Sequence, residues 1–180
     1  MEIIPLRIDG AFLVNTQVIE DPRGFFLETV RHEVLAEALG RPVELRQSNH
    51  SRSQARTLRG FRCEPWDKLI YVPHGRIIAA VADPRQSSPT FGEHELIPMG
   101  DAPAARTRLF VSRGLANGFY CETEADYVND VSEIYTPSVR RGFRWNDPTL
   151  AIPWPDPDPI LSEADQNLPT LEEMLAAEES

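Results

Sequence analysis

Residues 57–72, "TLRGFRCEPWDKLIYV", carry charged side chains where a short strand should be apolar. Arg59, Arg62, Glu64 and Lys68 follow one another closely, and Arg62 and Glu64 share a face if the chain is extended. Arginine and lysine donate hydrogen bonds to phosphate, whereas a carboxylate can accept a proton. The stretch therefore predicts one rim of a polar pocket, and its Arg59 and Lys68, together with the cations of 46–60, could surround a diphosphate. A solvated edge strand is the alternative.

A second polar segment precedes this stretch. In "RQSNHSRS" the side chains of Gln47, Asn49 and Ser51 alternate and should share one strand face, with His50 and Arg52 on the other. A polar strand face inside a β-barrel predicts a hydrophilic pocket. An ordinary edge strand remains the alternative here too.

A third segment, "EDPRGFFLET", combines an aromatic ring, a carboxylate and a guanidinium. Asp21-Pro22 and Gly24 favour a turn, and Arg23, Phe26 and Glu28 follow closely. Such a set can hold a planar base and a phosphate. The alternative is a hairpin edge with surface charges.

The region 108–137 contains a loop that enters a strand at Asn117. Beyond it, side chains that should share one strand face are Tyr127, Asn129, Val131, Glu133 and Tyr135. Tyrosines at strand spacing are typical of core positions at which the hydroxyl has a hydrogen-bond partner. This strand face could therefore belong either to a functional site or to the core.

Several function classes are disfavoured. The four histidines are scattered without ligand spacing, so we expect no metal site, and no glycine-rich loop opens a helix. The net charge is −10, and the segment after residue 150 contains eight acidic residues but no Lys or Arg, leaving about −2 on the rest. A nearly neutral body disfavours binding of a nucleic-acid polymer.

We expect neither a secretory signal nor a membrane-spanning segment. It has no apolar run of 18 residues and no basic segment followed by a long apolar stretch, so we expect a cytoplasmic protein that does not bind membranes. Cys63 and Cys121 are too few for a disulfide framework, and we expect two buried thiols.

The elements that must position these residues are mostly short strands. Apolar runs recur roughly every ten residues between the 16 prolines and 10 glycines, which is typical of an all-β sandwich or barrel. Only 31–40, ending at Gly40, and 170–179, capped by Thr170, have helical patterns. The prolines of 146–165 predict an extended arm without regular structure. We expect one domain over 1–180, with its core at about 10–150 and the arm and C-terminal helix at 151–180.

Taken together, the motifs resemble the dTDP-4-dehydrorhamnose 3,5-epimerase family of the cupin superfamily from about residue 10 to residue 173. The similar segments are "DPRGFFLET", "QSNHSRS", "LRGF", "KLIYV", "GRIIAAVADPRQSSPTFGEH", "GLANGF", "RGFRWNDPTLAIPWP" and "PILSEADQNLPTLEEM". The resemblance implies a jelly-roll homodimer that needs neither metal nor cofactor. It also implies inversion of C3, C5 or both on a nucleotide-linked 4-keto-6-deoxyhexose. That reaction needs a base, a residue that orients it, a cation near the enolate oxygen and an acid on the opposite face.

The resemblance also implies residue roles for nucleotide binding. Arg23, Phe26 and Glu28 match the segment that reaches thymidine diphosphate bound to the partner subunit, so the site would be shared across a homodimer. Residues that match other binding positions are Gln47 and Asn49 in the pocket, Arg59 at the phosphate or sugar, and Tyr135 stacked on the thymine ring.

The catalytic positions match only in part. Lys68 aligns with the lysine near the enolate oxygen, and Asp165 with the aspartate that orients the base. The base histidine, however, is replaced by Arg62, and an arginine stays protonated in proteins and cannot accept a proton. Asn129 stands at the position of the proton-donating tyrosine, and Asn117 at that of a further histidine.

These replacements lead to specific expectations. A positively charged Arg62 should form an ion pair with Asp165. Glu64, on the same strand face, could act as a displaced base. Three functions therefore remain open: an epimerase of dTDP-linked sugars, a nucleotide-sugar-binding protein without turnover, and a different isomerisation in which Lys68 or Glu64 titrates.

Overall fold

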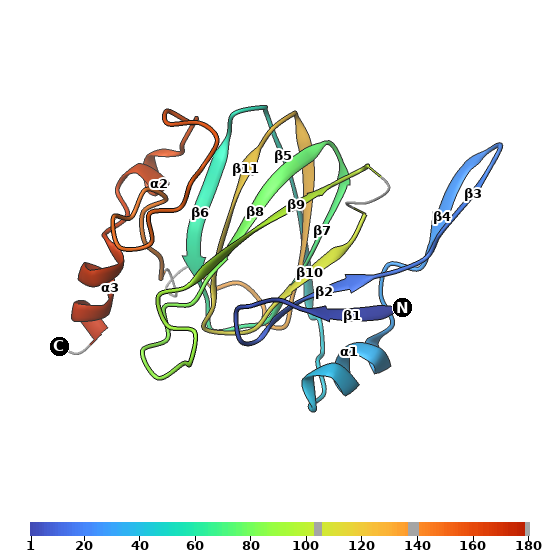
Figure 1. Ribbon diagram of the computed structural model, residues 1–180, viewed down its shortest axis with the longest axis horizontal. Coiled ribbons are helices and arrows are strands. Elements are labelled where there is room, and N and C mark those ends of the chain that lie inside the picture. The colour runs from blue at the N-terminus through green and yellow to red at the C-terminus, as the bar shows by residue number, and fades with distance from the viewer. Residues whose placement is uncertain (103–105, 137–140, 179–180) are drawn as a thin grey trace.

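Two antiparallel sheets face each other in the computed structural model, which describes residues 1–102, 106–136 and 141–178 (Figure 1). In spatial order, the larger sheet contains β1 (Glu2–Pro5), β2 (Ala11–Asn15), β10 (Arg108–Val111), β7 (Lys68–His74), β12 (Ala125–Val131) and β5 (Gln47–Ser53). The smaller sheet contains β6 (Leu58–Cys63), β11 (Ala116–Cys121), β8 (Arg76–Ala82) and β9 (His94–Gly100). The apolar runs of the sequence are thus strands, as expected.

The main core lies between the two sheets. Ile70 and Leu109 of the larger sheet pack in one cluster with Ile77, Val81 and Met99 of the smaller sheet, and all five are buried. Each such side chain contributes about 1.5–3 kcal/mol when removed from water. Each strand turns one face toward this layer, which explains why apolar and polar side chains alternate along the strands. The expected all-β jelly-roll sandwich is confirmed.

Helices occur at the two expected places. Helix α1 (His32–Leu39) ends at Gly40, whose φ of 62° is left-handed and whose N–H bonds to the last-turn carbonyls, so the expected C-cap is confirmed. Helix α3 (Leu171–Glu178) begins after Thr170, and Thr170 and Glu173 bond each other's backbone N–H groups. Residue 179 of the expected helix lies outside the described residues.

The expectation that residues 146–165 form no regular structure was wrong at the C-terminal end of this segment. A one-turn helix, α2 (Glu163–Gln166), follows the proline-rich stretch, and the Ser162 side chain accepts a hydrogen bond from the backbone N–H of Asp165. The prolines end at Pro159, so the residues beyond them are free to form a capped turn. This helix lies beside β6 and holds Asp165 near that strand (Figure 1).

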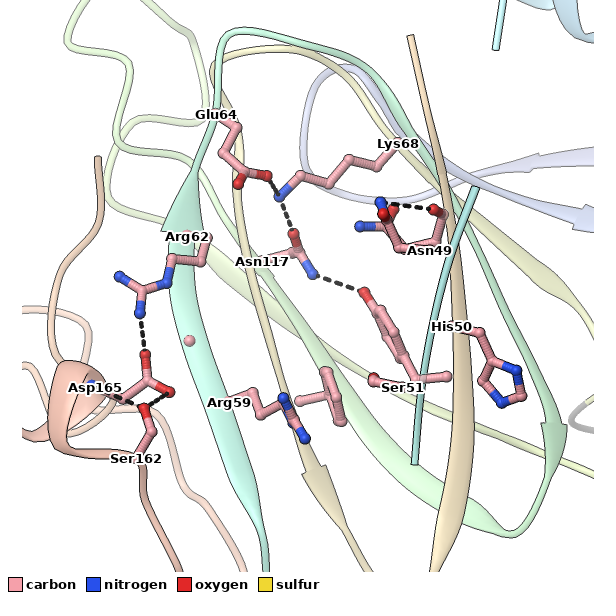
Figure 2. Close-up of a pocket in the computed structure, with 14 residues that line it drawn as sticks. Asn49, His50, Ser51, Arg59, Arg62, Glu64, Lys68, Asn117, Ser162 and Asp165 are labelled. Atoms are coloured by element: carbon pink, nitrogen blue, oxygen red, sulfur yellow. Dashed lines mark hydrogen bonds and ion pairs between the residues drawn. The ribbon is translucent and has the colours of Figure 1, made fainter. Parts of the chain in front are cut away.

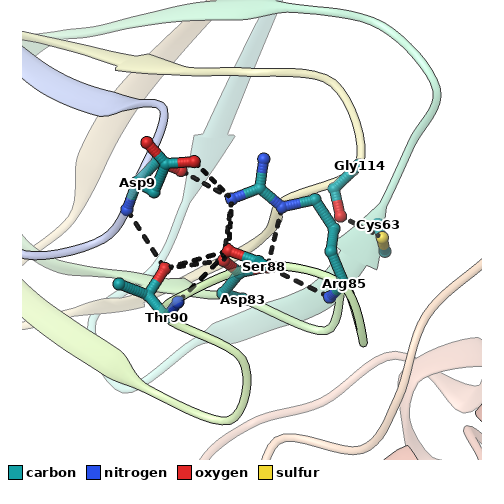
Figure 3. A network of polar contacts seen from close by, with 7 residues as sticks. All are labelled: Asp9, Cys63, Asp83, Arg85, Ser88, Thr90 and Gly114. Carbon is teal, nitrogen blue, oxygen red and sulfur yellow. Dashed lines mark hydrogen bonds and ion pairs between the residues drawn. The ribbon is translucent and has the colours of Figure 1, made fainter.

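The segment "RQSSPTFG" after β8 is held by a buried carboxylate (Figure 3). Asp83 is fully buried and accepts hydrogen bonds from Arg85, Ser88 and Thr90. Burial alone raises the pKa of Asp83, but these hydrogen bonds outweigh it and lower the pKa to about 2. The network also reaches the carbonyl of Asp9, so it ties this loop to the β1–β2 turn.

A two-stranded hairpin of β3 (Val18–Asp21) and β4 (Gly24–Leu27) projects away from both sheets (Figure 1). Its Ile19, Phe25 and Phe26 are exposed. Elsewhere, Cys63 and Cys121 are buried free thiols, as expected. None of the helices in the described ranges is long and apolar enough to cross a membrane.

Candidate functional site

A cavity of about 340 Å³ opens beside the smaller sheet and gathers most of the predicted site residues (Figure 2). From the smaller sheet and the loop after β6 it is lined by Arg59, Arg62, Glu64 and Asn117. Asp165 of α2 closes the same side. The three segments "LRGF", "GLANGF" and "LSEAD" therefore meet at one place, although they are far apart in the sequence.

The larger sheet supplies the other side of the cavity. Its contributions are Asn49 of β5, Lys68 of β7, and Tyr127 and Asn129 of β12. Asn49 and Asn129 are direct partners in the β5–β12 register. The Oδ1 atom of Asn129 is buried and accepts no hydrogen bond from the residues that the structure describes. It is therefore an acceptor suited to a ligand hydroxyl.

Close backbone contact between β6 and β11 affects where Arg59 and Asn117 lie. Gly60 has a φ of 124°, and a Cβ atom there would lie 2.6 Å from the Cα of Gly118. Only glycine fits, because a side chain would clash with backbone. The pairing shifts register between Asn117 and Phe119, next to this contact. The contact thus brings Arg59 of β6 and Asn117 of β11 to the same cavity.

Arg62 and Asp165 form an ion pair in the cavity. Arg62 Nη2 donates to Asp165 Oδ1, and Asp165 Oδ2 accepts a hydrogen bond from Ser162 Oγ at 2.9 Å (Figure 2). The Asp165 side chain is only 7% exposed and that of Arg62 30%. The expected Arg62–Asp165 pair is confirmed. The charges of the two side chains therefore offset each other.

A series of hydrogen-bonded side chains crosses the cavity through Lys68. The ammonium of Lys68 lies 2.7 Å from Glu64 Oε2 and donates to Asn117 Oδ1 at 2.5 Å (Figure 2). Asn117 Nδ2 in turn donates to the hydroxyl of Tyr127 at 3.1 Å. Burial raises the pKa of Tyr127, so its phenol stays protonated. A buried ammonium beside a carboxylate can stabilise negative charge that develops on a ligand oxygen.

Arg59 differs from the other cations of the cavity. Its Nε donates to Ser53 Oγ at 2.9 Å, and it forms no ion pair with any residue in the described part of the chain. By contrast, Arg62 is paired with Asp165 and Lys68 with Glu64. Arg59 is exposed and therefore available to a ligand anion such as phosphate.

Five predicted residues lie outside this cavity. Arg23, Phe26 and Glu28 belong to the projecting hairpin or the residues just after it, where Arg23 pairs with Asp21 and Glu28 with Arg31. Their predicted contact with a partner's nucleotide stays a prediction.

The other two lie close together where β5 begins. Gln47 donates to Asn49 Oδ1 at 2.6 Å and accepts from the backbone N–H of Tyr135 at 2.9 Å. The Tyr135 ring packs edge-on against Trp66 and is 41% exposed. Stacking of Tyr135 on a base remains a prediction.

Sequence reasoning did not select Tyr127 or Ser162 as site residues. Tyr127 stacks on Phe119 at 4.1 Å and belongs to the core cluster, so the core interpretation was right for its ring. Its hydroxyl nevertheless reaches Asn117 at the cavity. The sequence did contain a signal for this position, because Tyr127 stands two residues before Asn129 and should share its strand face.

His50 lines the cavity, but its imidazole contacts Asp126. Its imidazole pairs with Asp126 at 3.1 Å, as does Arg52, on the strand face opposite to Asn49 and Ser51. No group of three or more His, Cys, Asp or Glu side chains in the described ranges is arranged to hold a metal ion. Besides its arginines, the titratable residues that line the cavity are His50, Glu64, Lys68, Tyr127 and Asp165.

Comparisons with known proteins identify the family of the chain. The family model described as dTDP-4-dehydrorhamnose 3,5-epimerase matches residues 5–173. The chain belongs to the dTDP-4-dehydrorhamnose 3,5-epimerase family. The enzyme of that name from Shigella flexneri is 34% identical over 172 residues, which cover 93% of this chain and 94% of the relative.

Solved structures of this epimerase family are also similar. A 4-keto-6-deoxy sugar epimerase from the novobiocin biosynthetic gene cluster of Streptomyces spheroides superposes with a TM-score of 0.93 at 33% identity, covering 99% of this chain and 91% of that one. A Legionella pneumophila epimerase in complex with dTDP-4-keto-L-rhamnose has a TM-score of 0.89 at 30% identity, covering 98% and 95%. The epimerase-family fold thus extends over nearly the whole chain.

Proposed function

We propose that the chain binds a dTDP-linked 4-keto-6-deoxyhexose and acts on it as a metal-independent nucleotide-sugar epimerase. The ketone acidifies the neighbouring C–H bonds, so removing and returning a proton inverts the carbon. Family membership and the dTDP-sugar bound to a similar structure support the substrate class. The observation that carries the reaction class is the buried Lys68 ammonium, because it can hold the oxygen of an enolate.

The charges of the cavity support one orientation of the ligand. Arg59 is free to bind the diphosphate, and Lys68 lies deeper, 3% exposed, where the ketone would bind. The acceptor Oδ1 of Asn129 fits a sugar hydroxyl. Removal of Arg59 should therefore weaken nucleotide binding, whereas removal of Lys68 should impair chemistry more than binding.

A second candidate function is nucleotide-sugar binding without turnover. The Arg62–Asp165 ion pair favours it, because an arginine cannot take a proton and the pair fills the base position. In this alternative the Lys68–Glu64 pair would only hold the sugar. The chain would then act through binding alone.

One experiment separates the two functions. The protein is incubated with dTDP-4-keto-6-deoxyglucose in deuterated water, and C3 and C5 are followed by NMR while nucleotide affinity is measured by calorimetry. Incorporated deuterium with inversion supports the epimerase. Binding without any incorporation supports the second function, and the absence of binding contradicts both.

We further propose that two copies of the chain share their nucleotide sites. The hairpin β3–β4 projects from the sheets with Phe25 and Phe26 exposed, as expected of a segment that contacts a second subunit. Light scattering of the wild type should give a dimer. The double variant Phe25→Ser, Phe26→Ser should lower the dimer fraction and the affinity for thymidine diphosphate together.

A further inference from the structure

We infer that Glu64 and Tyr127 are the base and the acid of this cavity, replacing the family positions occupied here by Arg62 and Asn129. The inference rests on the proposed function and names its catalytic residues. A continuous chain of hydrogen bonds joins the two side chains through Lys68 and Asn117. The proposed catalytic groups thus lie two residues from those family positions, Glu64 just after β6 and Tyr127 on β12.

Glu64 has the contacts of a base. Its side chain is 16% exposed and lines the cavity, and its Oε2 atom is held by Lys68. Among the described residues, none donates a hydrogen bond to Oε1, so this oxygen can approach a ligand C–H bond (Figure 2). An ammonium has three N–H donors, and two of those of Lys68 point at Glu64 and Asn117. The third is available to the ketone oxygen, which places the neighbouring carbon beside the carboxylate.

Tyr127 has the contacts of an acid on the other side. Its hydroxyl accepts from Asn117, and it donates no hydrogen bond to another residue in the described part of the chain, so its own proton is available to a ligand. It extends from β12 of the larger sheet, whereas Glu64 follows β6 of the smaller sheet. The two groups therefore come from different sheets, and a ligand bound between them would have one group at each of its faces. Inversion requires such an arrangement.

The proposed reaction balances without a further reagent. Glu64 takes the proton from the carbon next to the ketone, the C–H electron pair forms the enolate C=C bond, and the carbonyl π pair moves to the oxygen held by Lys68. Tyr127 then gives its phenol proton to the opposite face of that carbon, and the C=O bond re-forms. Glu64 finally loses its proton to water and Tyr127 regains one from water.

The test uses matched variants with two readouts, NMR of deuterium incorporation and calorimetry with thymidine diphosphate. Glu64→Gln should lower incorporation by about 100-fold or more, and formate should restore part of the activity of Glu64→Ala. Tyr127→Phe should still incorporate deuterium, because Glu64 returns it to the same face, but the product should keep its configuration. Nucleotide affinity should stay within about threefold in each variant.

Matched controls are Glu122→Gln and Tyr120→Phe. Glu122 pairs with Arg76 on the surface and the Tyr120 hydroxyl bonds to Asp156, both outside the cavity, so these variants should incorporate deuterium and invert as the wild type does.

The outcomes separate this inference from the proposed function. If the wild type binds and inverts the sugar but Glu64→Gln retains wild-type incorporation, or Tyr127→Phe inverts at the wild-type rate, the inference is overturned and the proposed function stands. If the wild type binds the sugar without incorporation, binding without turnover is the function and the inference is overturned. If the wild type does not bind the sugar, both fail.

Discussion

Replacing Arg62 by methionine tests the ion pair at the base position. Methionine retains much of the volume of the arginine stem but leaves the carboxylate of Asp165 without its cation. That carboxylate is 7% exposed and would keep only the one hydrogen bond that it accepts from the hydroxyl of Ser162. An uncompensated buried charge is costly, so we expect the variant to be less stable than the wild type.

The size of the effect follows from the exposure of the two partners. Breaking a fully buried pair costs about 3–5 kcal/mol. Arg62 is 30% exposed, so water already weakens this pair, and we expect a loss of about 2 kcal/mol in the free energy of unfolding. For a chain of this length that corresponds to a Tm lower by about 4–8 °C. Changing Asp165 to Asn in the same background should recover about half of the loss, because the amide carries no charge.

The assay is chemical denaturation at neutral pH and fixed protein concentration, with thermal melting in parallel. Arg46→Met is the matched control, because Arg46 forms an exposed pair with Glu133, and it should change the free energy of unfolding by less than about 0.5 kcal/mol. If Arg62→Met is as stable as this control, or if Asp165→Asn adds a further loss to it, then the pair does not stabilise the fold and the reasoning is refuted.

Three further predictions concern other contacts. Arg59→Ala should weaken binding of thymidine diphosphate about tenfold in calorimetry with little change in Tm, since Arg59 has no ion-pair partner among the described residues; binding at wild-type strength would contradict this. Because the pKa of Asp83 is lowered to about 2, its stabilising contribution is complete above its ordinary pKa of 3.8 and is lost as the pH falls toward 2. Ser88→Ala removes a donor to Asp83, so circular dichroism should show acid unfolding at a higher pH than in the wild type, and an unchanged midpoint would argue against the network. Thr170→Ala should lower the free energy of unfolding by about 1 kcal/mol, whereas Thr170→Ser should not, because only the former removes the cap hydroxyl.

Local sequence signals were sufficient for most elements of the fold. Apolar runs between prolines and glycines indicated the strands, Gly40 indicated the end of α1, and Thr170 the start of α3. These signals work because each depends on a few neighbouring residues: the alternation of side chains, a left-handed φ, or a hydroxyl near a free N–H. The α2 turn was missed because prolines before it dominated the pattern, although Ser162 stands at its cap position.

The sequence by itself determined which chemistry is present and which is missing. An arginine cannot accept a proton, and an asparagine cannot donate one at useful acidity. The sequence therefore showed without a structure that Arg62 and Asn129 cannot do what the histidine and tyrosine of the resemblance would do. Opposite charges at Arg62 and Asp165 were enough to predict their pairing, which the structure confirms.

Only the tertiary structure decided how the remaining groups are connected. Glu64, Lys68, Asn117 and Tyr127 come from separate strands or loops, and whether their polar atoms meet depends on sheet packing, the Gly60–Gly118 contact and the register shift beside it. A hydrogen bond requires its two atoms to lie about 3 Å apart, and no local pattern specifies such a distance between residues distant in sequence. Tyr127 is therefore a core residue by its sequence pattern, and a residue of the cavity by virtue of the fold.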